Sequence, residues 1–305
     1  MSEQLLAELR PSAFAIAYRM LGSVAEAEDI VQEALLRLHR ALQQRQPIAA
    51  PRAYLATVTT RLALDELRSA RARREHYVGQ WLPEPLLTDP GDDLAARAEM
   101  ADSLSLAFLV VLESLSPDQR AAFLLRDVFD YGYGEIAALI GTSEANARQL
   151  AARARRQVAE RRPRFAASRD QCDELAQRFF AAAHAGDLGA LEALLAHDVA
   201  LRGDGGGKAP ALARSLEGRS RVARTLLAWA GQGLRVSQVA LHQVEVNGQP
   251  GALLLDGAGK LIGVMALDIA GGAIQAVSAI VNPDKLRHIG PIGDLRGVLK
   301  RRDGA

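Results

Sequence analysis

A cluster of arginines follows the start of the second helix in a short two-helix pattern near the middle of the chain. Residues 133–140 have the apolar spacing of a helix, Gly141 permits a sharp turn, and Ser143 can cap a second helix. Beyond the start of that second helix, Glu160 is the one acid among six arginines: Arg153, Arg155, Arg156, Arg161, Arg162 and Arg164. A helix-turn-helix places its second helix in the DNA major groove, with basic side chains on phosphates. The pattern predicts DNA binding, with a helical hairpin carrying a solvated arginine face as the alternative.

Two further polar clusters precede this pattern. Asp29, Gln32, Glu33 and Arg37 recur at spacings of three and four residues, which place them on one face of a helix. Such a face is either a docking surface for another protein or a solvated helix surface, and the spacing does not decide between them. Residues 61–74 are rich in arginine, whose charge suits the neutralisation of phosphates.

The order of these clusters resembles a known family. Residues 27–40 resemble the core-polymerase-binding helix of bacterial sigma factors. That helix, the arginine-rich segment and the helix-turn-helix follow one another as in the small, two-region sigma factors of the extracytoplasmic-function group. Residues 81–86 (Trp-Leu-Pro-Glu-Pro-Leu), 204–208 (Asp-Gly-Gly-Gly-Lys) and 282–286 (Asn-Pro-Asp-Lys-Leu) look like the subgroup with a fused SnoaL-like C-terminal domain. The resemblance covers nearly the whole chain.

The resemblance implies a partner for each polar cluster, core RNA polymerase for the first and promoter DNA for the others. The residues implied to bind core polymerase are Asp29, Gln32, Glu33 and Arg37. The residues implied to contact the −10 element are Arg61, Arg68, Arg71 and Arg74. The residues implied to read the −35 element are Asn146, Arg148, Gln149, Arg153 and Arg156. Arginine suits guanine, and Gln or Asn suits adenine. Ala152 stands where many relatives carry a bulkier residue, which leaves the −35 sequence open.

The segment after the first helices is expected to be a linker that docks on a surface. Pro83, Pro85 and Pro90 forbid a continuous helix there, while Trp81 and Leu82 make the segment apolar. An apolar linker must be covered in the folded protein. We therefore expect the C-terminal domain to pack against the sigma regions through this linker and to hold a compact, inactive arrangement. The interdomain regulatory residues implied by the resemblance are Trp81, Leu82, Pro83, Asp204, Lys208, Asn282, Pro283, Asp284 and Lys285.

A SnoaL-like enzyme, or a small-ligand sensor, fused to a DNA-binding module is the alternative function. Acid/base chemistry inside an apolar cone could use His197, Asp198, His242 or Asp268, yet no paired carboxylates or His-Asp dyad stands out by spacing. The glycine-rich segment fails the nucleotide-binding pattern, because Ala209 stands where Ser or Thr should follow the lysine. We expect no catalytic residue, no cofactor and no metal site, and we leave a small ligand of the C-terminal domain open.

Composition agrees with a multidomain protein. The chain has 305 residues, with 49% hydrophobic residues, 24% charged residues and a formal net charge of +1. A near-neutral total is compatible with DNA binding, because the arginines are clustered. Cys172 is the single cysteine, so no intramolecular disulfide can form. The N-terminus lacks signal-peptide features and no run of about 18 apolar residues occurs, so we expect a cytoplasmic protein that does not span a membrane.

The elements that must position these residues fall into three domains. We expect two all-α sigma domains, the second with the helix-turn-helix, and then an α+β SnoaL-like domain with a cone-shaped curved sheet. The predicted boundaries are 1–75 (region 2), 76–100 (linker), 101–165 (region 4), 170–288 (SnoaL-like domain) and 289–305 (tail). Helices are expected at 173–185 and 188–195, followed by a run of antiparallel strands at 199–201, 234–246, 252–255, 261–269 and 274–281. Asn247-Gly248 and Asp256-Gly257 are hairpin turn signals.

Overall fold

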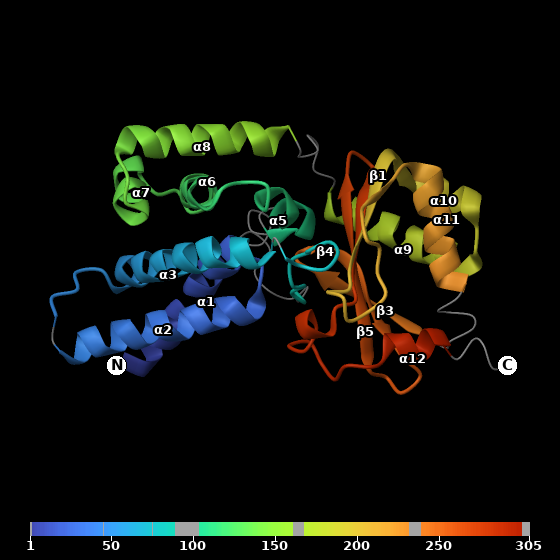
Figure 1. Cartoon of the computed structure of the whole chain (residues 1–305), viewed down its shortest axis with the longest axis horizontal. Coiled ribbons are helices and arrows are strands. Elements are labelled where there is room, and N and C mark those ends of the chain that lie inside the picture. The colour runs from blue at the N-terminus through green and yellow to red at the C-terminus, as the bar shows by residue number, and fades with distance from the viewer. Residues whose placement is uncertain are drawn as a thin grey trace. The chain divides into compact units, whose positions relative to one another are not determined.

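The protein forms two compact units that are interleaved in sequence (Figure 1). The structure is a computed structural model, and it describes residues 2–44, 46–74, 76–88, 104–160, 168–231 and 239–300. The first unit comprises Met1–His76 and Leu109–Arg162, and the second comprises Tyr77–Phe108 and Pro163–Ala305. The described part of the expected linker, 77–88, therefore belongs to the C-terminal unit while it connects the two halves of the first unit.

Three helices open the first unit. They are α1 (Ser2–Leu21), α2 (Val24–Gln43) and α3 (Pro51–Arg74). Small and aliphatic side chains at their contacts are almost fully buried, among them Ala17, Ala34 and Leu38. Ser23 ends the turn before α2 and caps it, because its hydroxyl accepts a 3.2 Å hydrogen bond from the Glu26 N–H.

The second half of the first unit holds the helix-turn-helix. Its elements are α5 (Leu106–Leu112), α6 (Pro117–Phe123), the π-helical turn η1 (Leu124–Val128), α7 (Tyr133–Ile140) and α8 (Glu144–Ala159). Gly141, between α7 and α8, has φ 75° and ψ 42°, a left-handed conformation that glycine adopts without steric cost. The Ser143 hydroxyl accepts a hydrogen bond from the Asn146 N–H at 3.2 Å and caps α8. The predicted helix-turn-helix is confirmed.

A buried guanidinium joins the two halves of the first unit. Arg120 of α6 is 1% exposed, and its Nε and Nη2 donate to the backbone oxygen of Arg19 at 3.3 and 3.1 Å. Its Nη1 forms an ion pair with Glu113. Arg19 is itself buried with its guanidinium 5.7 Å from the centre of the Phe129 ring, and this burial lowers the pKa of Arg19 to about 10. Arg19 therefore remains charged at neutral pH.

The second unit is built on a six-stranded mixed sheet of order β2-β1-β6-β5-β4-β3. The strands are β1 (Leu195–Asp204), β2 (Leu216–Glu217), β3 (Ala240–Val246), β4 (Gln249–Leu255), β5 (Leu261–Ala270) and β6 (Ala273–Ile280). The expectation of an antiparallel run was wrong for one pair, since β1 and β6 are parallel. Parallel neighbours need a long crossover connection, which the chain between β1 and β6 supplies. Of the strand expected at 234–246, residues 234–238 lie outside the described residues.

Three helices cover one side of this sheet (Figure 1). They are α9 (Arg169–Ala185), α10 (Leu188–Leu194) and α11 (Arg219–Ala230). The first two agree with the sequence prediction. The third was not predicted, although Val222, Ala223 and Leu226 are spaced to bury one helical face and are all buried. The expected α+β class of this domain is confirmed.

The turns and the C-terminal end of the second unit follow local chemistry. Asn247 and Gly248 have φ 53° and 72°, the pair of left-handed residues that a two-residue hairpin between β3 and β4 requires. After β6 come the 3-10 turn η3 (Pro283–Lys285) and helix α12 (Leu295–Lys300). The backbone around Ile292 pairs with Leu261 at the start of β5, so the described part of the expected tail, 289–300, packs as part of this unit.

We predict that Arg120→Met destabilises the first unit far more than Arg68→Met. The first change removes the buried guanidinium that serves Glu113 and the Arg19 carbonyl, and breaking such a buried pair costs about 3–5 kcal/mol. Arg68 pairs with Asp118 at 2.8 Å on a half-exposed surface, which contributes at most about 1 kcal/mol. Urea unfolding followed by far-UV circular dichroism measures both variants. Equal losses in the two variants would contradict the structural role of Arg120.

Candidate functional site

The linker runs along the β3 edge of the second unit's sheet. The Thr88 N–H donates to the Glu245 carbonyl at 3.1 Å, and the Leu86 carbonyl accepts from the Asn247 N–H at 2.8 Å. Leu87 pairs with Val246 in an antiparallel bridge. The linker therefore adds a short strand to β3, a mode of attachment in which backbone hydrogen bonds supply the affinity.

The side chain of Asn247 hydrogen-bonds to the linker and to a second backbone segment. Its Oδ1 accepts from the Leu86 N–H at 2.9 Å, and its Nδ2 donates to the Leu104 carbonyl at 3.0 Å. The residue is fully buried, so both amide groups need these partners. The sequence marked Asn247 only as a turn residue. Nothing in its local pattern could indicate that its side chain also holds two backbone segments that are distant in sequence.

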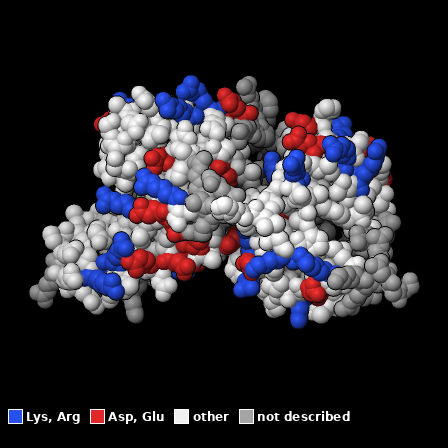
Figure 2. All heavy atoms as spheres, in the orientation of Figure 1, with Lys and Arg blue, Asp and Glu red and all other residues white. Residues whose placement is uncertain are grey.

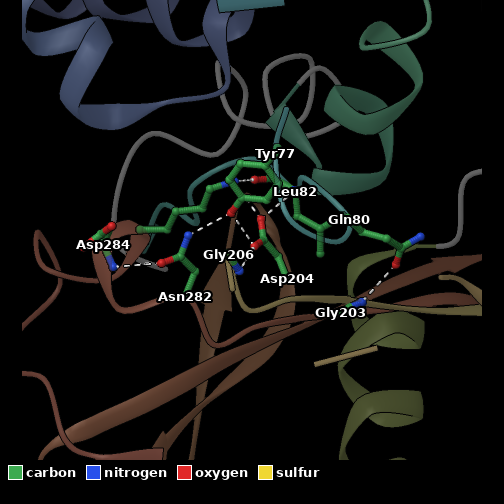
Figure 3. Close-up of polar contacts among 9 residues, drawn as sticks. Tyr77, Gln80, Leu82, Gly203, Asp204, Gly206, Asn282 and Asp284 are labelled. Carbon is green, nitrogen blue, oxygen red and sulfur yellow. Dashed lines mark hydrogen bonds and ion pairs between the residues drawn. The ribbon is translucent and has the colours of Figure 1, made fainter. Parts of the chain in front are cut away.

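The carboxylate of Asp204 is the hub of the site (Figure 3). It is fully buried at the end of β1. Its Oδ1 accepts from the Tyr77 hydroxyl at 2.6 Å and from the Gly206 N–H at 3.1 Å. Its Oδ2 accepts from the Leu82 N–H at 2.8 Å and from Lys285 Nζ at 2.7 Å. Two of these donors come from the linker, so the buried charge ties the linker to the C-terminal domain.

Lys285 connects the hub to the aromatic residues of the linker. Its Nζ also donates to the Leu82 carbonyl, and it lies 4.1 Å from the centre of the Trp81 ring and 5.0 Å from that of Tyr77. A cation above aromatic faces in a buried site is stabilised by the ring quadrupole. Asn282 Nδ2 donates to the Tyr77 hydroxyl at 2.8 Å. Burial and the hydrogen bond to Asp204 raise the pKa of Tyr77, so the phenol stays protonated and donates.

The glycine-rich loop has no room for larger side chains where it packs against this cluster. Gly206 has φ 55°, and a Cβ there would lie 2.3 Å from Asn282 Nδ2 and 3.0 Å from the Tyr77 hydroxyl. A Cβ on Gly205 would lie 2.1 Å from the Ala209 carbonyl oxygen. Close packing therefore explains the glycines at positions 205 and 206.

The structure brings most of the predicted interdomain residues together. Trp81, Leu82, Asp204, Asn282 and Lys285 meet at the hub, and Pro83 is buried in the same linker segment. Two others are peripheral: Lys208 pairs with Asp284, and both side chains are at least 39% exposed. Pro283 begins η3, the turn that carries Lys285.

Sequence reasoning missed several linker contacts. Gln80 donates from Nε2 to Ser215 Oγ at 2.6 Å and accepts from the Gly203 N–H at 3.2 Å. His288 Nε2 lies 2.8 Å from the Pro85 carbonyl oxygen. Single polar residues in loops carry no periodic signal, so only the folded chain reveals such partners.

Helix α8 presents the predicted DNA-reading residues on one exposed face. Alanines form its buried face, at positions 147, 151 and 154, and this lets α8 lie close to α6 and α7. The exposed residues are Asn146, Arg148, Gln149, Arg153 and Arg156. Figure 2 shows Lys and Arg side chains gathered over α8 at the upper edge of the molecule. Two arginines of α8 have partners within the unit. Arg148 pairs with Glu144 and lies 5.2 Å from the centre of the Tyr133 ring. Arg155 pairs with Asp127 at 2.6 Å and donates to the Tyr133 hydroxyl at 3.3 Å.

The predicted polymerase-binding face of α2 is exposed and carries an apolar residue. Asp29 and Gln32 are exposed, and Arg37 Nε pairs with Glu33 Oε1 at 2.7 Å. Leu36 lies within about one turn of Gln32, Glu33 and Arg37. It is 40% exposed, one of three large hydrophobic residues so exposed among the described residues. The sequence pattern missed Leu36, because leucine on a helix usually indicates the core.

The predicted −10 residues of α3 contact the helices of region 4 in the same unit. Arg61 Nη2 donates to the Ala138 carbonyl of α7 at 3.3 Å. Arg68 Nη2 pairs with Asp118 of α6 at 2.8 Å. The side chains of Arg71 and Arg74 lie outside the described residues. Two of the four predicted −10 residues are therefore engaged by α6 and α7, the helices that pack against the predicted −35 helix α8.

No group of three or more His, Cys, Asp or Glu side chains in the described ranges could hold a metal ion. None of the described helices combines the length and the apolar character needed to cross a membrane.

The fold and these surfaces define a two-region sigma factor with a third, fused domain. Family models for Sigma-70 region 2 and Sigma-70, region 4 match residues 5–73 and 105–158. The chain is 44% identical over 290 residues to the ECF RNA polymerase sigma factor SigJ of Mycobacterium tuberculosis, covering 91% of this chain and 90% of that protein. It is 34% identical over 274 residues to the probable ECF RNA polymerase sigma factor SigI of the same species, covering 89% and 90%. The crystal structure of M. tuberculosis SigJ matches 96% of this chain and 100% of its own, with a TM-score of 0.77 and 38% identity.

The chain belongs to the extracytoplasmic-function (ECF) RNA polymerase sigma factors, in the group with a SnoaL-like C-terminal domain. Sigma factors bind core RNA polymerase and promoter DNA. The protein is accordingly an alternative sigma factor that acts in transcription initiation.

We predict that Lys285→Met loosens the linker, whereas Lys208→Met does not. Removing Lys285 leaves the buried Asp204 without its counter-charge, a loss of about 3–5 kcal/mol for the cluster. Lys208 pairs on the surface and serves as the matched control. Amide hydrogen exchange of residues 77–88, measured by mass spectrometry, should be faster only in the first variant. Unchanged exchange in folded Lys285→Met would show that the ion pair does not hold the linker.

Proposed function

We propose that the fused C-terminal domain controls the sigma factor by holding its linker. The observation that carries this proposal is the buried Asp204 carboxylate, which takes two of its four donors from residues 77–88. Those residues connect region 2 to region 4 along the chain. A domain that binds the connection between two DNA-binding regions can govern how far apart those regions move.

The separation that promoter binding needs is large. Elements centred near −10 and −35 are about 25 base pairs apart, which is roughly 85 Å at ~3.4 Å per base pair. Within the first unit, by contrast, Arg61 of region 2 lies 3.3 Å from the Ala138 carbonyl oxygen of region 4. The two regions must therefore part before the protein can occupy both promoter elements.

The linker is long enough for this separation only if it is free to extend. From His76 to Leu109 the chain advances 109 − 76 = 33 residues, or about 110 Å at full extension. Each linker residue that stays bound to the C-terminal domain shortens the distance that the linker can span. Core polymerase would open the closed form by binding the separated form more tightly, which is the only way a ligand shifts such an equilibrium.

We assign the exposed surfaces to the partners that sigma factors bind. Asp29, Gln32, Glu33 and Arg37, with Leu36 among them, form the surface for core polymerase. On DNA, Arg61, Arg68, Arg71 and Arg74 serve the −10 element, and Asn146, Arg148, Gln149, Arg153 and Arg156 serve the −35 element. The contacts of Arg61 and Arg68 with region 4 support a closed form in which two of the proposed −10 residues are engaged by region 4.

Transcription tests the regulatory proposal. We predict that Lys285→Met raises promoter-dependent run-off transcription with limiting core polymerase by about 5- to 150-fold, the range of a 1–3 kcal/mol coupling. Lys208→Met should match the wild type. Equal transcription by all three proteins at every polymerase concentration would refute control through the linker.

The recognition helix has its own test. We predict that Arg148→Ala and Arg153→Ala each weaken binding to the correct −35 sequence, with about 1–3 kcal/mol lost for each base contact removed. Arg155→Ala is the control, because Arg155 is not among the predicted base readers and pairs with Asp127 outside α8. Holoenzyme binding to correct and scrambled −35 sequences gives the discrimination ratio. Wild-type discrimination in both variants would contradict the assignment of α8 as the reader.

A further inference from the structure

The second unit contains an apolar cavity of about 410 Å³. Helix α9 contributes Phe179 and Ala183 to its lining, α11 contributes Trp229, and α12 contributes Val298. Strands of the sheet supply the remaining sides. The volume lies within the range of small-molecule sites, about 300–1,000 Å³, and is too small for a protein segment of any length.

The lining selects an uncharged ligand. None of the described residues around the cavity carries a charge, and the polar side-chain group among them is the indole N–H of Trp229. A charged molecule would lose its hydration there without gaining a partner. His197, Asp198, His242 and Asp268, the acid/base candidates from the sequence, are all absent from the described lining. The chemistry therefore favours binding rather than acid/base catalysis at this place.

Two residues of the cavity wall also hydrogen-bond to residues that bind the linker or belong to it. Gly203 lines the cavity, its N–H donates to Gln80 of the linker at 3.2 Å, and it directly precedes Asp204 (Figure 3). Val281 lines the cavity, and its N–H donates to the Asp204 carbonyl at 2.8 Å. The residue after Val281 is Asn282, which contacts Tyr77. The ends of β1 and β6 thus present one side to the cavity and the other to the linker.

Helix α12 makes a third connection. Its Leu295 and Val298 line the cavity, while its Arg296 donates from Nη2 to the Gly207 carbonyl at 3.1 Å. Gly207 belongs to the glycine-rich loop that packs against the Asp204 hub. A molecule in the cavity would therefore contact three segments that adjoin the Asp204 hub.

We propose that this cavity binds an uncharged, largely apolar small molecule, and that the bound molecule tightens the hold on the linker. Filling the cavity adds contacts to Gly203 and Val281 and so stabilises the arrangement in which Asp204 and Gln80 keep their partners. The proposed binding of a small molecule does not depend on the proposed function. Its effect on transcription rests on the proposed function, in which a held linker restrains the sigma regions.

Binding is tested with the full chain and N-phenyl-1-naphthylamine, an uncharged aromatic fluorophore. We expect saturable binding of one probe per chain, with energy transfer from Trp229 in a Trp81→Phe variant that has Trp229 as its one tryptophan. Ala183→Phe places a ring in the cavity and should weaken binding at least about tenfold, because the space is taken. Ala181→Phe, on the exposed face of the same helix, is the matched control and should bind as the wild type does. Absence of saturable binding, or equal binding by folded Ala183→Phe, overturns the site.

Coupling is tested by amide hydrogen exchange of residues 77–88. Saturating probe should slow this exchange by about twofold or more in the wild type, because a ligand of the native form opposes local opening. The same probe concentration should have no effect in Ala183→Phe. Exchange that is unchanged or faster in the wild type overturns the coupling. If the probe slows exchange while Lys285→Met leaves transcription unchanged, the proposed function fails and the ligand site stands.

Discussion

The buried carboxylate of Asp204 is the interaction on which the arrangement of the C-terminal unit depends. A charge removed from water is tolerated only when partners surround it. Asp204 gathers its partners from the linker, from the glycine-rich loop and from the turn after the last strand. Because each donor must approach within hydrogen-bonding distance, the three segments have one way to fit together. The glycines and Lys285 are both consequences of that requirement.

This hub makes the linker a part of the fold. A flexible tether would let two DNA-binding regions move independently of a third domain. Here the tether is a strand on β3 at one end and a set of donors to Asp204 at the other. Extending it therefore requires breaking buried polar contacts. In the proposed mechanism the C-terminal domain therefore sets the free energy of opening, although the surfaces proposed to bind polymerase and DNA lie in the first unit.

The first unit uses a similar device. Arg120 is a buried charge whose partners, Glu113 and the Arg19 carbonyl, come from both halves of that unit. A buried guanidinium is directional, so it favours one relative position of the two helical groups more strongly than aliphatic packing would. Breaking such contacts has a definite cost, and an opening reaction that is controlled by a partner needs a defined closed state.

Much of the fold could be predicted from local patterns. The helix-turn-helix followed from Gly141 and Ser143, the helices α9 and α10 from their apolar spacing, and most strands from alternation between turn residues. The motif residues Trp81, Asp204 and Lys285 could be singled out before their contacts were known. The parallel pairing of β1 with β6, helix α11, and the packing of the chain after residue 288 could not be predicted with the same means.

The sequence by itself determined the helix caps, the turns and the charge clusters, because these depend on neighbours a few positions away. Only the tertiary structure decided what they contact. Tyr77, Gln80 and Asn247 hold the linker through partners more than 120 residues distant. Arg61 and Arg68 likewise contact region 4 through residues that are distant in sequence. The cavity beside Gly203 forms only when the helices pack on the sheet. Contacts between distant residues are set by the packing of whole elements around buried charges and cores, and no short window of sequence contains that information.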